Sequence, residues 1–486
     1  MITPPEISWI AIAPDLTLAV GAALVLLVDV QWKPPPRVWG WVVGATLALA
    51  TGLTVLQWLE GTDAAAAGDS GALIAFSGMI TMDGLTVFSR LALLTATALG
   101  VTGGWRFVVG LGRRGAEALA LVLLATSGFS LMVASNNLVM MFLGLEVGSI
   151  ALYVLAGLAR ERRESEEAAI KYFLLGSFAS ALFVYGVALI YAGTRQFEVL
   201  EIRHFLDNFI VTSPAVIYIG LGLVIAGLGF KVSAAPFHAW APDVYQGAPA
   251  GLVGYMAAVA KVAGFAAITR ILLTALPELD ATWLPVVAGI SVLSMLLGSV
   301  LALVQGDVRR LLAYSGVAHA GFIMTGVVGG STGPILFYLA IYSIQLIGAF
   351  AVVAVVSGPD GAGSSMDRYR GLGRRSPLLA SSFAVLLLGM GGLPLTSGFV
   401  AKFGVFTEAW GRGYEWLVIV AVVASVIAFA FYIRVIVVMY MDDDEAEEAP
   451  RVGPEGWVLA VAVGTTILWG IFPSSLLDLA ADALPL

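Results

Sequence analysis

Ionisable side chains lie inside long apolar runs of this sequence, where a charge has no water to stabilise it. Lys231 ends the apolar run 215–230, and Pro236 follows it five residues later. A charged residue at the centre of a membrane span costs at least ~2.5–3.5 kcal/mol, so such residues are candidates for function. The proline removes a backbone donor and frees the carbonyl one turn back, at Val232. A buried cation beside an interrupted helix, followed by His238, indicates the beginning of a proton or cation path.

The placement of the lysines supports this interpretation. The chain has five lysines, and only Lys33 lies in an ordinary loop. Lys261 and Lys402 lie inside apolar runs, and Lys171 lies at the start of another. Random placement would favour the polar loops, so the concentration of lysines in apolar runs needs an explanation other than chance.

A second interrupted segment precedes Lys402. Gly391, Gly392, Pro394 and Gly398 open the helix ahead of this lysine. Interrupted helices survive in lipid only where protein or water satisfies the freed backbone groups. Two interrupted segments at corresponding positions of two halves indicate a transport site at the membrane midplane, built from structural repeats.

Glu146 and Lys171 each have two interpretations. Glu146 is interpreted as the only acid deep inside a hydrophobic run, and Gly144 and Gly148 flank it at a spacing that allows close helix approach. It is either half of a structural salt bridge or a titrating partner of a buried lysine. Lys171 has Glu167 four residues earlier, so it is either a structural ion pair at a span end or a further member of the path.

Three other polar residues could bridge gaps between the lysines. His238 lies just beyond the first break, and Tyr314 and His319 lie five residues apart in a later apolar run. Histidine titrates near neutral pH, which suits proton exchange. Each of the three could instead be a polar side chain satisfied within the core, and the residues alone leave both interpretations open.

Composition narrows the class of protein. The chain is 59% hydrophobic and 12% charged over 486 residues, which is typical of a multi-span membrane protein. Its lack of cysteine excludes disulfides and cysteine-bound iron–sulfur clusters. The three histidines are too far apart for a local metal motif, and no G-x-x-x-x-G-K-[ST] motif is present. No basic segment precedes the first apolar run, so we expect no cleaved signal peptide.

The hydropathy pattern predicts an all-α polytopic membrane protein with about fourteen spans, of which spans 7 and 12 are interrupted. The predicted spans are 7–30, 38–58, 84–103, 115–133, 137–158, 168–193, 213–237, 248–275, 282–304, 310–330, 333–357, 377–408, 415–440 and 455–475.

The charges of alternate loops predict the orientation. Fourteen loop cations follow spans 1, 3, 5, 9 and 11, whereas the opposite loops hold only Arg195, Arg203 and Arg412. The positive-inside rule therefore places the first set in the cytoplasm and both termini in the periplasm. The fourteen are Lys33, Arg37, Arg106, Arg113, Arg114, Arg160, Arg162, Arg163, Arg309, Arg310, Arg368, Arg370, Arg374 and Arg375.

Three long motifs carry a resemblance to a known family. They are F-K-x-x-x-x-P-F-H-x-W-x-P-D-V-Y-Q-G-A-P at 230–249, R-R-L-L-A-Y-S-x-x-A-H-x-G at 309–321 and G-L-P-x-x-x-G-F-x-x-K-F at 392–403. Together the motifs resemble the antiporter-like membrane subunits of respiratory complex I, a family shared with multi-subunit cation/proton antiporters and membrane-bound hydrogenases. The resemblance covers roughly residues 80–440.

Within the family the chain is most similar to the N-type subunits of the bacterial complex. Lys402 argues against the M type, which typically has glutamate there, and an end soon after span 14 argues against the L type. Gly316 stands where serine is more usual, and the acidic loop 442–448 has no family explanation.

The resemblance also implies roles for individual residues. Glu146 and Lys231 match a coupled pair, Lys261 matches a central lysine and Lys402 matches a distal lysine towards the exit. Lys171 matches a further lysine on the sixth span.

The resemblance implies a proton channel in a larger redox complex. We expect two inverted five-helix repeats, at 115–275 and 276–440, between flanking helices at 1–114 and 441–486. No cofactor is expected in this chain, because FMN, iron–sulfur clusters and quinone would belong to other subunits. The expected partners are an M-type subunit, small K-, J- and A-type subunits and the lipid of the bacterial inner membrane, with no nucleic acid. Two alternatives stay open: a subunit of a sodium/proton antiporter or membrane-bound hydrogenase, and a scaffold that pumps nothing.

Overall fold

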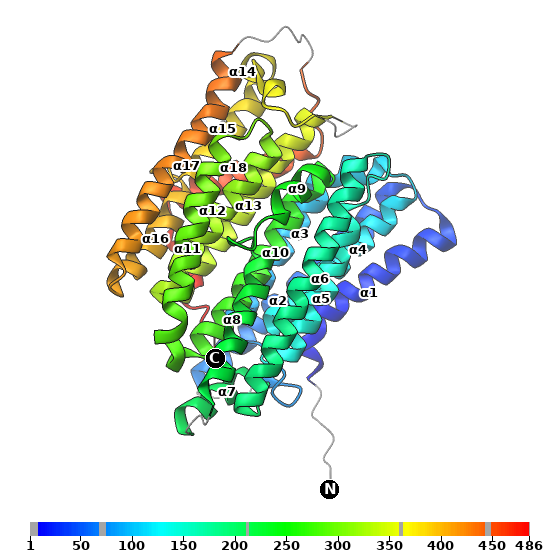
Figure 1. The fold of residues 1–486 in the computed structure, drawn as a ribbon. Coiled ribbons are helices and arrows are strands. Elements are labelled where there is room, and N and C mark those ends of the chain that lie inside the picture. Colours follow the sequence, from blue (N-terminus) through cyan, green and yellow to red (C-terminus); the bar gives the residue numbers. More distant parts are fainter. Residues whose placement is uncertain (1–7, 68–73, 210–212, 359–362, 443–448, 486) are drawn as a thin grey trace.

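The computed structural model describes residues 8–67, 74–209, 213–358, 363–442 and 449–485, which form a bundle of long helices (Figure 1). Most of the acidic loop, at 443–448, lies outside the described residues. In order, the main helices are α1 (Trp9–Trp32), α2 (Pro36–Ala67), α3 (Gly84–Gly110), α4 (Arg114–Ala134), α5 (Leu138–Ala156), α6 (Arg163–Thr194), α8 (Pro214–Lys231), α9 (Trp240–Gly247), α10 (Ala250–Thr269), α11 (Asp280–Leu303), α12 (Val308–Gly329), α13 (Thr332–Ser357), α15 (Pro377–Gly391), α16 (Ser397–Gly411), α17 (Glu415–Met441) and α18 (Glu455–Ile471).

The helices agree with the predicted multi-span fold. In the described parts of the chain, twelve helices are long and apolar enough to cross a membrane, or thirteen if α18 and α19 (Ser474–Ala481), which meet at 84°, count as one span. The pair α15 and α16 occupies the predicted interrupted span 377–408, although each half has only 15 residues.

Several short elements were not predicted. An antiparallel hairpin joins β1 (Ile74–Ala75) to β2 (Ile80–Thr81), and α7 (Val199–Asn208) lies between α6 and α8. The π-helix η2 (Arg270–Ala275) continues α10, and the 3-10 helix η3 (Pro277–Leu279) leads into α11. Between α13 and α15 lie the 3-10 helix η4 (Met366–Tyr369) and α14 (Leu372–Arg375). These short elements escape a pattern search that looks for runs of about 20 apolar residues.

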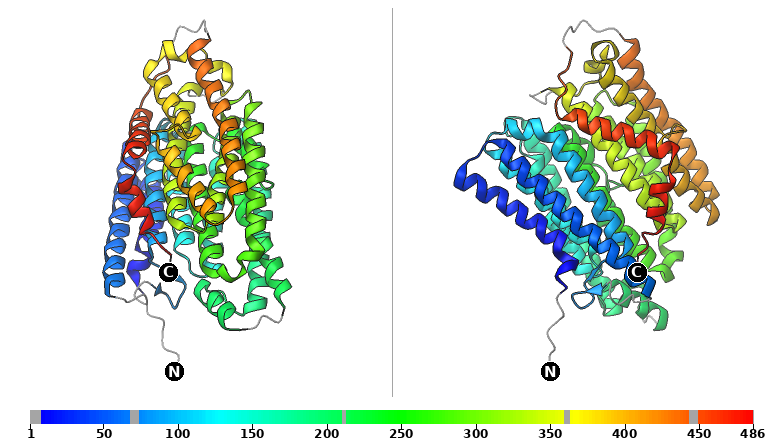
Figure 2. Two further views of the ribbon diagram at one scale, coloured as in Figure 1. Left: turned by 90° about the vertical axis from the view of Figure 1, so that its left-hand side faces the viewer. Right: turned by 180° about the vertical axis from the view of Figure 1, so that it is seen from behind.

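Figure 1 shows α1–α6 on one side of the bundle and α11, α12, α16 and α17 on the other, with α8 and α10 between them. In the view from behind, α18 crosses the back of the bundle (Figure 2). Helices α10 and α12 are almost completely buried, and α13 is nearly so. Residues on these three helices are therefore shielded from lipid by the rest of the chain.

Both predicted helix breaks are present. Helix α8 ends at Lys231, and the next helix begins only at Trp240. Helix α15 ends at Gly391 and α16 begins at Ser397. In the second break Gly392 has a φ of +87°, a left-handed conformation that glycine adopts without steric cost.

The close helix approach expected beside Glu146 is also present. A Cβ atom on Gly144 would lie 2.6 Å from the backbone nitrogen of Met132, and one on Gly148 would lie 2.6 Å from the ring of Phe129. Both neighbours belong to α4, so the two glycines allow α4 and α5 to pack with their backbones nearly in contact.

Candidate functional site

Lys231 lies at the end of α8 inside a cage of aromatic rings. Its ammonium lies 4.9 Å from the ring centre of Phe129, 5.9 Å from that of Tyr153 and 5.7 Å from that of Tyr172. The side chain is buried, and Nζ donates a hydrogen bond of 2.7 Å to Oγ of Ser149. Aromatic faces attract a cation within about 6 Å, so the rings partly replace the water that the charge has lost.

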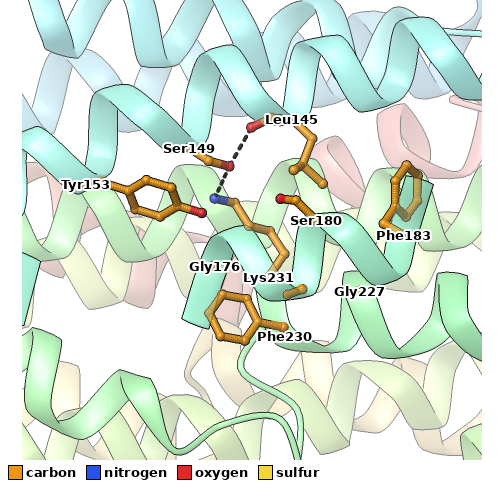
Figure 3. Close-up of a pocket in the computed structure, with 10 residues that line it drawn as sticks. Leu145, Ser149, Tyr153, Gly176, Ser180, Phe183, Gly227, Phe230 and Lys231 are labelled. Atoms are coloured by element: carbon orange, nitrogen blue, oxygen red, sulfur yellow. Dashed lines mark hydrogen bonds between the residues drawn. The ribbon is translucent and has the colours of Figure 1, made fainter. Parts of the chain in front are cut away.

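Figure 3 shows the surroundings of this ammonium. Tyr153 and Ser180 point toward Nζ from either side, and Ser149 donates its own hydrogen to the carbonyl of Leu145. These side chains come from α5 and α6, whereas the lysine comes from α8. The site therefore exists only where these three helices meet.

Glu146 lies near Lys231 but not in direct contact with it. The two charges interact electrostatically, yet the ammonium is bonded to Ser149, one helical turn further along α5. The Oε1 atom of Glu146 is buried and has no hydrogen-bond partner within the described residues. Lys231 is therefore hydrogen-bonded to a neutral hydroxyl in this structure, and the buried Oε1 of Glu146 carries the cost of an unpartnered oxygen.

Lys261, on α10, is bonded to the first helix break. It is only 1% exposed, and its Nζ donates a 2.6 Å hydrogen bond to the carbonyl of Val232, the residue directly after Lys231. The carbonyls at the end of a helix lack partners inside it and carry partial negative charge, which suits an ammonium. The carbonyl at Val232 thus brings the second lysine next to the first.

Lys402, on α16, is bonded to the second break in the same way. Its Nζ donates a 2.9 Å hydrogen bond to the carbonyl of Gly391, the last residue of α15, and lies 4.5 Å from the ring centre of Phe322. The side chain is buried. Each break therefore supplies a carbonyl oxygen that accepts a hydrogen bond from a buried lysine.

His319 lies between the two breaks, on α12. Its Nδ1 shares a 2.8 Å hydrogen bond with the hydroxyl of Tyr338, and its Nε2 shares one of 3.2 Å with the hydroxyl of Tyr432. The Tyr432 hydroxyl is also hydrogen-bonded to Ser315. All of these side chains are buried, so they form a continuous set of groups that can each accept and donate a hydrogen.

His238 and Tyr314 lie together, at the side of this row. Their ring centres are 6.3 Å apart, and both side chains are partly exposed. The Nδ1 atom of His238 is buried and has no hydrogen-bond partner in the part of the chain that the structure describes.

Lys171 occupies a different setting from the other three lysines in spans. Its side chain is 41% exposed, and Nζ lies 2.6 Å from Glu167 and 2.7 Å from Asp243 on α9. Asp243 also binds Arg310, on α12, at 2.7 Å. Burial raises the pKa of Asp243, but the hydrogen bonds from Lys171 and Arg310 outweigh it and hold that pKa below its usual value. This geometry matches the interpretation of Lys171 as a structural ion pair at the end of a span.

Two buried ion pairs were missed by the sequence analysis. Arg90 binds Asp15 at 2.5 Å, and Arg270 binds Asp83 with two bonds of 2.7 and 2.9 Å. The four side chains are at most 8% exposed. Glu146 is therefore not the only acid deep in a hydrophobic run, because Asp15 lies inside α1. The sequence did carry a signal for these pairs, because three of the four residues lie within apolar runs, where any charged side chain is as costly as that of a lysine. These three are Asp15, Arg90 and Arg270.

The fold and the site together define a polytopic membrane protein in which a row of buried cations crosses between two interrupted helices. A family model described as NADH:quinone oxidoreductase/Mrp antiporter, TM matches residues 135–428. The chain belongs to this family, and within it to the group of NADH-quinone oxidoreductase subunit N.

Three similar proteins illustrate the relationship. The NADH-quinone oxidoreductase subunit N of Desulfovibrio desulfuricans is 40% identical, over 96% of this chain and 95% of its own length. A chain in respiratory complex I from Thermus thermophilus with bound aureothin is 32% identical with a TM-score of 0.81, covering 97% of this chain and all of that one. A chain of an archaeal membrane-bound sulfane sulfur reductase has a TM-score of 0.85 over 98% of this chain and 97% of its own, but its 24% identity supports the fold alone.

Proposed function

We propose that this chain is the proton-translocating membrane subunit of an NADH–quinone oxidoreductase. The observation that carries the proposal is the setting of Lys231, Lys261 and Lys402. Each ammonium is buried and bonded to a neutral oxygen, of Ser149, Val232 and Gly391 respectively. This setting determines how firmly each lysine holds its proton.

A single neutral oxygen stabilises an ammonium only weakly against the loss of water. A carboxylate partner would hold the proton firmly, whereas desolvation favours its release. A lysine bonded to a neutral oxygen therefore holds its proton less firmly, and it can change its protonation state when a nearby charge moves. The three settings therefore support titration rather than permanent ion pairing.

The proposed path begins at Glu146 and Lys231. When the charge of a neighbouring subunit changes, Glu146 moves toward or away from Lys231, and the proton on Lys231 is retained or released. A released proton passes to Lys261, which is bonded to the residue directly after Lys231. It then crosses the hydroxyls around His319 and reaches Lys402.

The remaining assignments extend this proposal. His238 and Tyr314 would supply a side connection to the row, and Lys171 would hold α9 in place through Asp243. The boundary between the two five-helix repeats would lie at 275/276. Both termini would face the periplasm of the bacterial inner membrane, because the other set of loops holds most of the cations.

The chemistry that drives the pump would lie outside this chain. FMN, iron–sulfur clusters and quinone would belong to other subunits. An M-type antiporter-like subunit and the small K-, J- and A-type subunits would be its neighbours in the membrane arm. The energy of electron transfer would then reach Lys231 as a change of charge in one of these neighbours.

Substitution of Lys231 tests the proposal. In inverted membrane vesicles, Lys231→Ala should strongly lower NADH-driven proton uptake, and NADH oxidation with it, while the complex still assembles on a native gel. Lys231→Arg should also fail, because a guanidinium with a pKa above about 12 does not release its proton. Lys33→Ala, which removes a loop lysine, is the matched control and should behave like the wild type.

The scaffold alternative predicts the reverse pattern. If the ammonium only held helices together, arginine would preserve pumping and alanine would abolish assembly. Replacing Na⁺ by choline in the same assay separates the antiporter alternative, since proton uptake should not depend on Na⁺.

A further inference from the structure

Tyr342 has a buried hydroxyl that no described residue satisfies. The side chain lies on α13 and is 1% exposed, yet its Oη has no hydrogen-bond partner among the described residues. A buried polar group left without a partner is destabilising, because it has lost its hydrogen bonds to water. Phenylalanine would fill the same space without this cost, so packing does not explain the hydroxyl.

The hydroxyl faces Lys261 across a glycine. A Cβ atom at Gly316, on α12, would lie 3.2 Å from Oη of Tyr342 and 3.8 Å from Nζ of Lys261. The two polar groups therefore border the same small space, which the missing side chain of Gly316 leaves open. The two groups are not hydrogen-bonded to each other, so a proton passes between them only through a water molecule in this space or after a movement of the lysine side chain.

The aromatic ring of Tyr342 packs against the imidazole ring of His319. The two ring centres are 4.4 Å apart with an angle of 32° between the planes. His319 in turn holds Tyr338 and Tyr432 through its two ring nitrogens. Tyr338 and Tyr342 are four residues apart on α13, so one face of that helix presents both to the histidine.

We propose that the hydroxyl of Tyr342 relays the proton between Lys261 and the His319 cluster. The proposal rests on the lysine path described above and adds a residue to it. An N–H bond of Lys261 breaks as an O–H bond forms on Oη, by way of a water molecule in the space beside Gly316. The hydrogen that Oη carried passes to the hydroxyl oxygen of Tyr432, and the hydrogen of that hydroxyl passes to Nε2 of His319, with which it shares a hydrogen bond. No tyrosinate forms, because a hydroxyl can accept one hydrogen and donate another.

The test compares two tyrosines in the assembled complex. Tyr342→Phe removes only the hydroxyl and should lower the rate of NADH-driven proton uptake about a hundredfold, the lower end of the range for the loss of one proton-transfer group. Tyr369→Phe is the matched control, because Tyr369 on η4 is equally buried and its hydroxyl is equally unpartnered within the described residues. Removing either hydroxyl leaves folding unharmed, so native gels should show wild-type amounts of both variants.

A rescue variant separates a relay from a structural effect. With Tyr342→Phe, the nearest neighbour of a Cβ at Gly316 is Cε of Lys261 at 3.6 Å, an ordinary contact. Gly316→Ser combined with Tyr342→Phe then returns a hydroxyl beside Lys261 and should recover much of the lost pumping per assembled complex. Gly316→Ala with Tyr342→Phe adds the same bulk without the hydroxyl and should recover none.

The outcomes distinguish this inference from the proposal on which it rests. Wild-type pumping in Tyr342→Phe, or equal pumping in the serine and alanine double variants, would overturn the relay. Lys261→Ala is measured alongside. If it pumps normally, the lysine path itself is wrong, whereas a defect there with normal Tyr342→Phe leaves the path intact and removes only the tyrosine.

Discussion

Gly398 controls how closely the two halves of the second break approach each other. It is the second residue of α16, and a Cβ atom there would lie 1.9 Å from the carbonyl oxygen of Gly389 on α15. Carbon and oxygen atoms in contact are normally more than 3 Å apart, so Gly398→Ala must push α15 and α16 apart by at least about 1 Å.

This displacement reaches Lys402 directly. The lysine lies one turn further along α16, and its 2.9 Å bond to Gly391 would lengthen to about 4 Å, beyond hydrogen-bonding distance. The overpacking costs about 1–3 kcal/mol and the lost charged hydrogen bond about 1.5–3 kcal/mol. Alanine regains at most about 1 kcal/mol through its higher helix propensity, which does not offset the loss.

Gly404 provides the matched control on the same helix. A Cβ atom there would lie 3.4 Å from Pro334, an ordinary contact, so Gly404→Ala should be neutral or slightly stabilising. Both variants are measured in inverted vesicles for proton uptake per assembled complex, and in detergent for the temperature at which the complex melts. Gly398→Ala should pump at least tenfold less and melt earlier. Wild-type behaviour of Gly398→Ala, or an equal defect in Gly404→Ala, would refute the close approach.

Two further predictions concern charged groups outside the lysine row. Arg270→Gln leaves the buried carboxylate of Asp83 without its guanidinium, so the complex should lose about 3–5 kcal/mol of stability, and adding Asp83→Asn should recover part of it. The melting temperatures of the wild type and of these two variants measure this. Lys171 and Arg310 hold the pKa of Asp243 below its usual value. The ionised carboxylate therefore stabilises the fold fully above about pH 4, which is the usual pKa of aspartate. This stabilisation is lost as the pH falls through the lower pKa of the folded state. Asp243→Asn should therefore melt earlier than the wild type at pH 7, by a small amount for a group this exposed, and the difference should disappear on acidification; a constant difference at every pH would contradict this.

Local sequence patterns were sufficient to predict the fold class and the broken helices. Whether a segment is stable in lipid depends on its own composition, so the spans can be predicted without knowing which helices they pack against. The break after Lys231 follows from the covalent structure of Pro236, and the break at Gly392 from the conformational freedom of glycine. Both are properties of a few adjacent residues.

The packing of distant helices decided which groups the buried charges meet. Lys261 is bonded to Val232, which lies 29 residues earlier, and Arg90 is bonded to Asp15 on another helix. A helix that is apolar on every side carries no periodic signal of which face meets which neighbour, so such partners cannot be read from the pattern. For the same reason Tyr342 was not predicted as a site residue, because it is an ordinary aromatic residue in an apolar run. Only the meeting of α10, α12 and α13 places its hydroxyl near Lys261 and its ring against His319.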